Sequence, residues 1–286
     1  MRVFPRYLCR KASLKKTLFT YWHQGFDSAP PVVKACLENA KRTLKDWEVH
    51  QLAENNVTSW IDPIPIPKSR WQQLCLAHRS DLIRTQLLIK HGGVWADPTV
   101  WFNRPLDDWL PEQMSAGLFL FQRPGRDRAI SNWFIAAEPG NRLLVCLYEN
   151  LCRYWSDNEF DNFNCAMRPG AQMLHKILRR HIELPRLWLK PSVIRLFRAF
   201  PYMIYHYMFY DIVRRDTECW EIWKNMSRRS ADLPHTLSHY GLLKELQPAI
   251  QRHIDEVQSP LYKLSWKLSG TTVPKGSVLD YLLSAR

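Results

Sequence analysis

The sequence lacks any run of about 20 uncharged apolar residues, so it contains no obvious membrane-spanning helix. Residues 1–22 are basic but have no continuous apolar segment, which makes them a poor secretory signal. Of the seven cysteines, an odd number, no two have the CxxC spacing. These absences argue against a disulfide framework and a zinc site. They predict reduced, mostly buried thiols in a cytoplasmic protein.

Acidic residues are too few to balance the basic ones, with 27 Asp and Glu against 40 Lys and Arg, a formal charge of +13. A surplus of this size implies an anionic partner, such as a phosphate-bearing substrate, an acidic lipid surface or a nucleic acid. The charge by itself does not choose among the three. With 286 residues, 46% of them hydrophobic, the chain is long and apolar enough for a packed core.

Strand and helix patterns alternate through the first hundred residues, which favours an α/β sheet. Apolar and β-branched runs predict strands at residues 17–22, 47–52, 94–96, 118–121 and 130–138. Apolar residues at helical spacing predict helices at residues 31–44, 70–91, 141–155 and 170–181. Gly92 and Gly93 end the second of these helices, and repeated proline excludes a regular helix at residues 62–67.

The segment HGGVWADPTVW, residues 91–101, places one carboxylate inside an apolar run. A buried charge needs a partner, so Asp97 is either a turn residue at a strand end or a group that holds a ligand. In open α/β sheets ligands bind at the carboxyl ends of the strands, where Asp97 is expected. The preceding helix carries Ser80, Asp81 and Arg84, and the last two share one helix face. Taken alone, that acid and base would be an exposed ion pair of little energetic value.

The order of these groups resembles the nucleotide-sugar-binding core of GT-A-fold glycosyltransferases. The shared pattern is SDxxR at residues 80–84 followed by GGVWxD at residues 92–97. It looks most like the capsular polysaccharide synthesis proteins and the DXD-containing sugar transferases of glycosyltransferase family 32, and the likeness continues at residues 20–26 and 131–137. The resemblance covers roughly residues 15–180. It implies a single GT-A-like, Rossmann-like α/β domain over residues 1–286, with a mixed sheet and a helical C-terminal extension from about residue 181 to 286.

The resemblance also implies roles for individual residues. Asp81, Arg84 and Asp97 match the catalytic group: the first two hydrogen-bond hydroxyls of the transferred sugar, and Asp97 is the first acid of the DXD motif. Trp22 matches the aromatic residue that stacks on the donor base. The remaining residues expected to bind the donor are Ser80, Asn132, Lys263 and Lys267. The competing interpretation is an ordinary polar strand position for the asparagine and a solvated strand face for the lysines.

The second acid of the DXD motif is missing, because Thr99 stands at that position. In the wider superfamily this acid binds a divalent metal that bridges the donor diphosphate. A hydroxyl is a weaker ligand for Mn²⁺ or Mg²⁺ than a carboxylate. Asp97, Thr99 and His239 are the candidate metal ligands, although His239 is equally interpretable as a surface histidine. The alternative to a metal is neutralisation of the diphosphate by Lys and Arg.

The function implied by the resemblance is transfer of a sugar, with retention of anomeric configuration, from a nucleotide-sugar donor. The acceptor would be a capsular or other cell-surface polysaccharide or a glycolipid. Two alternatives stay open. One is a basic nucleic-acid-binding protein, although the charges are spread along the chain without a recognisable binding motif, so no nucleic acid is expected as a partner. The other is a non-catalytic relative, suggested by Thr99.

Residues 193–213, VIRLFRAFPYMIYHYMFYDIV, combine aromatic and basic side chains. Pro201 interrupts any helix, and Arg195, Arg198 and His206 oppose a bilayer span. The segment suits a membrane surface, and a lipid-linked acceptor would favour peripheral contact with the inner face of the cell membrane. A buried core helix with a polar edge is the alternative.

Overall fold

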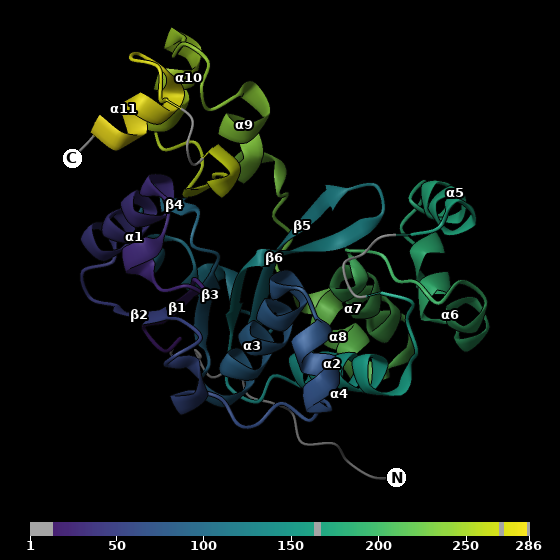
Figure 1. Ribbon diagram of the computed structural model, residues 1–286. Coiled ribbons are helices and arrows are strands. Elements are labelled where there is room, and N and C mark those ends of the chain that lie inside the picture. Colours follow the sequence, from purple (N-terminus) through teal and green to yellow (C-terminus); the bar gives the residue numbers. More distant parts are fainter. Residues whose placement is uncertain (1–13, 163–166, 269–271, 285–286) are drawn as a thin grey trace.

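The computed structural model describes residues 14–162, 167–268 and 272–284 (Figure 1). β1 runs parallel to β2 and β3, whereas β6 runs antiparallel to β3 and β5, in a five-stranded sheet of order β2-β1-β3-β6-β5. These strands are β1 (Thr17–Tyr21), β2 (Glu48–Leu52), β3 (Gly93–Ala96), β5 (Leu118–Gly125) and β6 (Arg128–Ala137). The predicted α/β architecture with a mixed sheet is therefore confirmed, and so are the five predicted strands.

Helices surround the sheet (Figure 1). Those in the first 180 residues are α1 (Pro31–Thr43), α2 (Lys68–Gln73), α3 (Leu76–His91), α4 (Arg142–Asp157) and α5 (Pro169–Leu178). The prediction of one helix over residues 70–91 is wrong in one respect, because the backbone is extended at Leu74, between α2 and α3. The Arg79 guanidinium donates hydrogen bonds to the carbonyls of Leu74 (2.9 Å) and Gln72 (2.7 Å), which satisfies the end of α2 and stabilises the break.

Successive strand residues point to opposite faces of the sheet, and each face has its own core. Phe19 and Trp95 belong to the larger core, together with residues of α3, α4 and α7 (Ile204–Arg215). Leu18 and Val94 belong to a second core, which includes the end of α1. Because both faces are covered, polar groups that need access to solvent or ligand can gather only at the edges of the sheet.

The aromatic segment 193–213 divides into α6 (Pro191–Phe197) and α7. Tyr205, Tyr207 and Phe209 of α7 are at most 1% exposed and pack in the larger core. The buried-core alternative is therefore correct for α7, and a membrane-facing role for this helix is wrong. In the part of the chain that the structure describes, no helix combines the length and the apolar character needed to cross a bilayer.

The C-terminal region is helical, as predicted, and contains α8 (Thr217–Asn225), α9 (Asp232–Tyr240), α10 (Pro248–Asp255) and α11 (Val278–Ser284). It also contributes a strand at Lys263, predicted from the sequence only as the competing interpretation of the lysines. β7 (Leu261–Lys263) pairs antiparallel with β4 (Val100–Phe102), and the register places Lys263 opposite Val100. A third core joins α1 to α9, β7 and α11, in the upper part of Figure 1. The late part of the chain is thereby fixed beside the segment that follows Asp97.

Candidate active site

A cavity of about 380 Å³ opens where β3 ends. Asp97 follows β3, Asp81 and Arg84 come from α3, Asn132 comes from β6 and Lys263 from β7, so distant segments meet at this point. His239 of α9 also lines the cavity. The structure therefore brings together most of the residues that the sequence analysis selected for the site.

Asp81 is only 6% exposed, and its carboxylate has several partners. Asn132 Nδ2 donates a hydrogen bond of 2.8 Å to Oδ1, and Arg84 Nη2 lies 3.6 Å from the same oxygen. His78 Nδ1 lies 3.7 Å from Oδ2. Burial alone would lower the pKa of His78, but its polar contacts with Asp81 and Cys75, and their charges, raise it to about 9. Asp81 and Arg84 are thus a buried network and not an exposed ion pair.

Arg84 connects the helix to two strands of the sheet. It is 5% exposed, and its guanidinium donates to the carbonyls of Ser80 and Asn132. Nη1 also lies 3.5 Å from Asp97 Oδ1, and the guanidinium carbon lies 4.9 Å from the centre of the Trp95 ring. The aromatic face favours the cation at this position. Arg84 therefore holds Asp81 and Asp97 in a fixed relation across the cavity.

Asp97 is the more accessible carboxylate, with 25% of its side chain exposed. Trp95 Nε1 donates a hydrogen bond of 3.0 Å to Oδ1, and Lys263 Nζ lies 3.6 Å from Oδ2. Lys263 Nζ also donates a hydrogen bond to Oγ1 of Thr99, a residue that is 1% exposed. The lysine ammonium thus lies between the side chains of Asp97 and Thr99.

The side chains predicted to bind a metal are those of Asp97, Thr99 and His239. A divalent cation needs several oxygen or nitrogen atoms directed at one point. Here the Thr99 hydroxyl and one Asp97 oxygen both face the Lys263 ammonium. Among the described residues, no three ligand atoms of His, Cys, Asp or Glu at this cavity lie within 4.8 Å of one another. This arrangement does not fit a divalent metal.

The other predicted donor-binding residues lie around the cavity and not in its wall. Ser80 Oγ accepts a hydrogen bond of 3.0 Å from Arg84 Nη2, so it supports the arginine. Trp22 follows β1 at the same edge of the sheet as Asp97, and its ring meets Trp266 edge-on with centroids 6.1 Å apart. Lys267 is exposed on the turn after β7. A donor base stacked on Trp22 stays a prediction.

Sequence reasoning missed Tyr202 and His206, which line the cavity from the segment interpreted as membrane-facing. His206 is 6% exposed, and burial lowers its pKa to about 4, so its ring is neutral at neutral pH. Arg128, at the start of β6, is a third cavity residue that was not selected. The position of His206 inside an aromatic run was the sequence feature that could have indicated this role, because a polar ring in an apolar segment needs a polar partner or a ligand.

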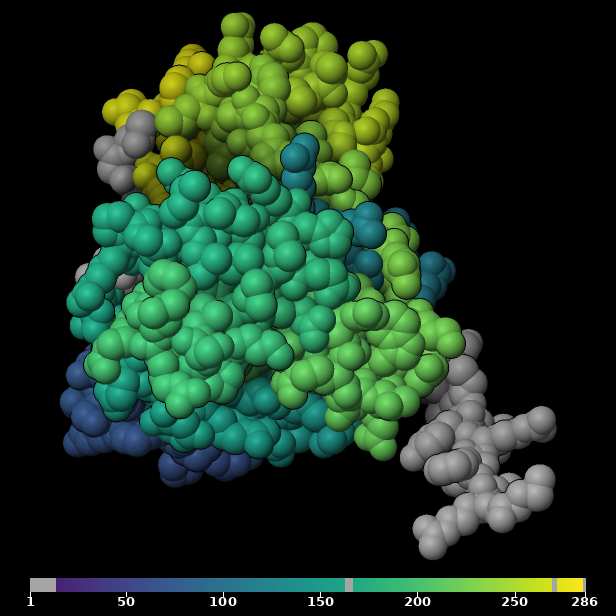
Figure 2. Space-filling model, turned by 90° about the vertical axis from the view of Figure 1, so that its right-hand side faces the viewer, coloured from purple at the N-terminus to yellow at the C-terminus, as the bar shows by residue number. Residues whose placement is uncertain are grey.

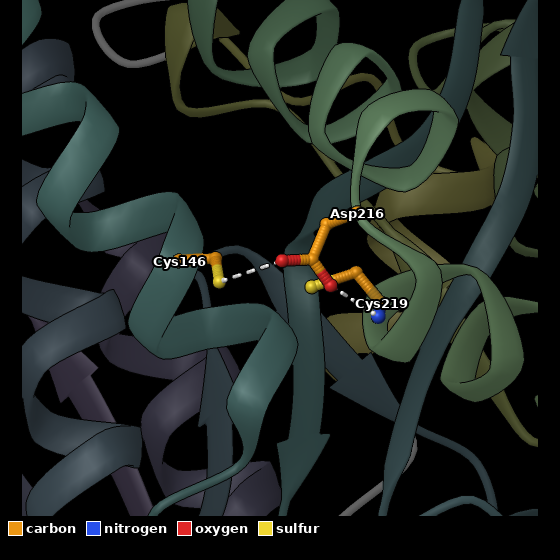
Figure 3. A group of neighbouring side chains, drawn as sticks. All are labelled: Cys146, Asp216 and Cys219. Carbon is orange, nitrogen blue, oxygen red and sulfur yellow. Dashed lines mark hydrogen bonds between the residues drawn. The ribbon is translucent and has the colours of Figure 1, made fainter.

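A separate cluster lies between α4 and α8 (Figure 3). The ligand atoms of Cys146, Asp216 and Cys219 lie within 4.8 Å of one another. In the described part of the chain, no other set of three His, Cys, Asp or Glu residues brings its ligand atoms this close together. Asp216 caps α8, because its Oδ1 accepts a hydrogen bond of 2.9 Å from the Cys219 amide. Burial raises the pKa of both thiols, which disfavours the thiolate that binds metals. The cluster is therefore a packing and capping feature.

The described cysteines agree with the prediction of mostly buried thiols. Cys36, Cys146, Cys152 and Cys219 are buried, whereas Cys75 is partly exposed, and no disulfide joins these five residues. Cys9 and Cys165 lie outside the described residues.

Two curated proteins similar to this chain match about half of it. O-glycosyltransferase braB of Annulohypoxylon truncatum is 30% identical over an alignment of 160 residues that covers 49% of this chain and 38% of that protein. O-glycosyltransferase PaGT of Phomopsis amygdali is 25% identical over an alignment of 161 residues that covers 50% of this chain and 39% of that protein. The matched stretch is thus well under half the length of either relative.

A solved structure named PaToxG Glycosyltransferase aligns with 90% of this chain and 88% of that chain, at 13% identity and a TM-score of 0.42. A TM-score below 0.5 does not establish a shared fold. A family model described as capsular polysaccharide synthesis protein matches residues 5–163, more than half of the chain. This stretch contains Asp81, Arg84, Asp97 and Asn132 with the elements that position them. As the resemblance predicted, the chain belongs to the family of capsular polysaccharide synthesis proteins.

Proposed function

We propose that this protein is a glycosyltransferase that moves a sugar from a nucleotide-sugar donor to an acceptor hydroxyl. The observation that carries the proposal is the buried network of Asp81, Arg84 and Asn132, which opens onto Asp97 and Lys263 in one cavity. Fixed carboxylate and amide groups suit sugar hydroxyls, and fixed cations suit a phosphate. The two relatives named as O-glycosyltransferases support the same activity.

In this proposal Asp97 receives hydrogen bonds from the donor sugar or ribose, because its carboxylate is the accessible one. During transfer the acceptor oxygen bonds to the anomeric carbon, and its hydroxyl proton passes to an oxygen of the departing diphosphate. The nucleoside diphosphate leaves with the electron pair of the broken bond. Positive charge fixed at the cavity, chiefly that of Lys263 and Arg84, stabilises the negative charge that develops on the leaving group.

We propose retention of anomeric configuration, which the resemblance to glycosyltransferase family 32 implies, without a covalent intermediate on Asp81 or Asp97. Both carboxylates lie within 3.6 Å of an Arg84 nitrogen. The leaving diphosphate would then guide the acceptor onto the same face of the sugar. Family membership favours a polysaccharide or glycolipid of the cell surface as the acceptor, and a cytoplasmic location fits the nucleotide-sugar donor.

The test is a screen of nucleotide sugars for hydrolysis and transfer, with and without Mn²⁺. Asp97→Asn keeps the shape of the side chain and should lower turnover by about 10²-fold or more. The matched control is Asp232→Asn, an exposed acid at the start of α9. Circular dichroism should show the same fold for both variants. Wild-type turnover by Asp97→Asn would contradict the site, and a wild-type protein inactive on every donor would favour a non-catalytic relative.

We also propose peripheral contact with an anionic membrane, made by α5 and α6 in place of α7. Residues 168–198 contain eight Lys or Arg and one acid, Glu183. Met173 is 61% exposed and Leu196 is 75% exposed in the same region. Figure 2 looks onto this face, where the teal and green segments around α5 and α6 form the centre of the surface. Apolar side chains surrounded by cations are the combination that favours acidic headgroups.

Sedimentation with vesicles tests this contact. Each basic residue near an anionic surface contributes about 1 kcal/mol, so Arg180→Glu with Arg195→Glu should weaken binding to phosphatidylserine vesicles more than tenfold. The control is Lys41→Glu with Lys224→Glu, which changes the net charge of the protein by the same amount but on α1 and α8. This control should bind the vesicles like the wild type. If the two double variants sediment equally with phosphatidylserine vesicles, the proposed contact is wrong. It is also wrong if the wild type binds neutral vesicles as well as it binds anionic ones.

A further inference from the structure

We propose that the ammonium group of Lys263 takes the place of a divalent metal and holds the donor diphosphate without a metal ion. The inference deepens the proposed function and rests on it. Lys263 Nζ donates a hydrogen bond to Thr99 Oγ1 and lies 3.6 Å from Asp97 Oδ2. In a metal-dependent DXD arrangement a cation lies between these two positions. Here the side chain of a lysine supplies that cation.

The position of Lys263 is set by the fold. β7 pairs with β4 in a register that puts Lys263 opposite Val100. The Leu264 amide donates a hydrogen bond of 2.9 Å to the Thr99 carbonyl, and Ser238 Oγ donates to the Lys263 carbonyl. These two bonds fix the backbone at Lys263. Because only 18% of the lysine side chain is exposed, its ammonium is confined to the edge of the sheet beside Asp97.

The charge of the cavity supports an anion as its ligand. Among the described lining residues, the cations Arg84, Arg128 and Lys263 outnumber the carboxylates Asp81 and Asp97. Oxygen-ligand metal sites normally have a surplus of carboxylates. A divalent ion bound to Asp97 Oδ2 would have to displace the ammonium that already faces this oxygen. A surplus of cations at a fixed position favours the phosphate groups of a donor.

The same contact gives Thr99 a physical role. Asp97 already lies 3.6 Å from the Lys263 ammonium, and an aspartate at position 99 would add a second negative charge that cancels what is offered to a phosphate. The threonine hydroxyl orients the ammonium through a hydrogen bond and adds no negative charge. The missing second acid of the motif and the presence of the lysine are therefore two parts of one arrangement.

Calorimetric titration with inorganic pyrophosphate in excess EDTA tests the proposal on the full chain. The wild type should bind pyrophosphate, and Lys263→Met should bind it at least tenfold more weakly. Lys224→Met, an exposed lysine on α8, should match the wild type. Thermal unfolding of each variant shows whether the fold is kept. Manganese titration followed by electron paramagnetic resonance should detect no stoichiometric site in the wild type that depends on Asp97.

Each of the following results would overturn the proposal. If the wild type binds pyrophosphate only when Mn²⁺ is added, or Asp97→Asn removes a stoichiometric manganese site, the metal and not the lysine holds the diphosphate. Glycosyl transfer would still stand in that case. If Lys263→Met binds pyrophosphate as tightly as the wild type in EDTA, the lysine has no such role. Failure of the wild type to bind pyrophosphate under either condition also overturns the inference, and failure of all nucleotide sugars as well would count against the proposed function.

Discussion

Replacement of Asp81 by asparagine should destabilise the protein much more in mild acid than in alkali. The variant keeps the Oδ1 atom that accepts the Asn132 hydrogen bond, but it removes the negative charge beside His78 and Arg84. Arg84 keeps Asp97 as a partner, whereas His78 loses the carboxylate that holds its proton. Since Asp81 is 6% exposed, solvent cannot replace this charge.

The magnitude follows from the pKa of His78, which lies at about 9 in the folded protein against an ordinary value of 6.5. This raised pKa stabilises the fold fully below about pH 6.5, and the contribution is lost as the pH rises through about 9. A difference of this size corresponds to about 3 kcal/mol. Asp81→Asn should therefore cost up to about 3 kcal/mol more free energy of unfolding at about pH 6 than at about pH 9.5, because Cys75 supplies the remainder of the shift.

Urea unfolding followed by tryptophan fluorescence at these two pH values measures the difference. Asp211→Asn is the matched control, because Asp211 is 8% exposed and its ion-pair partners, Arg186 and Arg215, include no histidine. Its cost should be the same at both pH values. In a His78→Phe background, Asp81→Asn should lose its pH dependence. A cost for Asp81→Asn that is equal at both pH values would refute the coupling.

Two further outcomes are expected. Burial lowers the pKa of His206 to about 4, so this histidine should cost the wild type about 3 kcal/mol of unfolding free energy as the pH falls from about 6.5 to 4. His206→Gln should reduce this loss in the same urea assay, and an unchanged dependence of the unfolding free energy on pH would count against it. Gly93→Ala should lower the urea midpoint of unfolding more than Gly140→Ala. Both glycines have positive φ, but a Cβ on Gly93 would meet the Thr17 carbonyl oxygen at 2.5 Å, whereas nothing lies within 4 Å of a Cβ on Gly140. The backbone conformation alone should make Gly140→Ala cost about 1 kcal/mol, and equal midpoints for the two variants would exclude the steric effect at Gly93.

Local patterns predicted the elements that carry the first half of the site. Residues 94–96 form a short apolar strand with a polar residue at its end, and α3 presents Asp81 and Arg84 from one face. This strand and this helix depend on residues close together in the sequence, so apolar periodicity and the glycines that end the helix predict them. The burial of the two charges was not predictable in this way. A helix with polar residues on its core side looks like an exposed helix until its partners in β3 and β6 are known.

Long-range pairing accounts for the parts that the sequence did not predict. Lys263 reaches Thr99 only because β7 pairs with β4, and both strands have three residues, too few for a clear alternating pattern. His206 was assigned to a membrane-facing segment because an aromatic run with basic flanks has the same composition at a membrane and in a core. The density of partners around α7, from α4 and β6 among others, decides for the core.

The contact between Thr99 and Lys263 joins positions 164 residues apart, and it makes their substitutions interdependent. Thr99→Asp alone should weaken pyrophosphate binding in EDTA, because the new carboxylate neutralises the ammonium. Combined with Lys263→Met, the same change leaves Asp97 and a second acid facing each other without the lysine, and this double variant should gain manganese binding. The two substitutions should therefore be strongly non-additive, as expected for groups in direct contact. Additive effects on both ligands would mean that the lysine and the threonine act independently, and that the departure at position 99 has another cause.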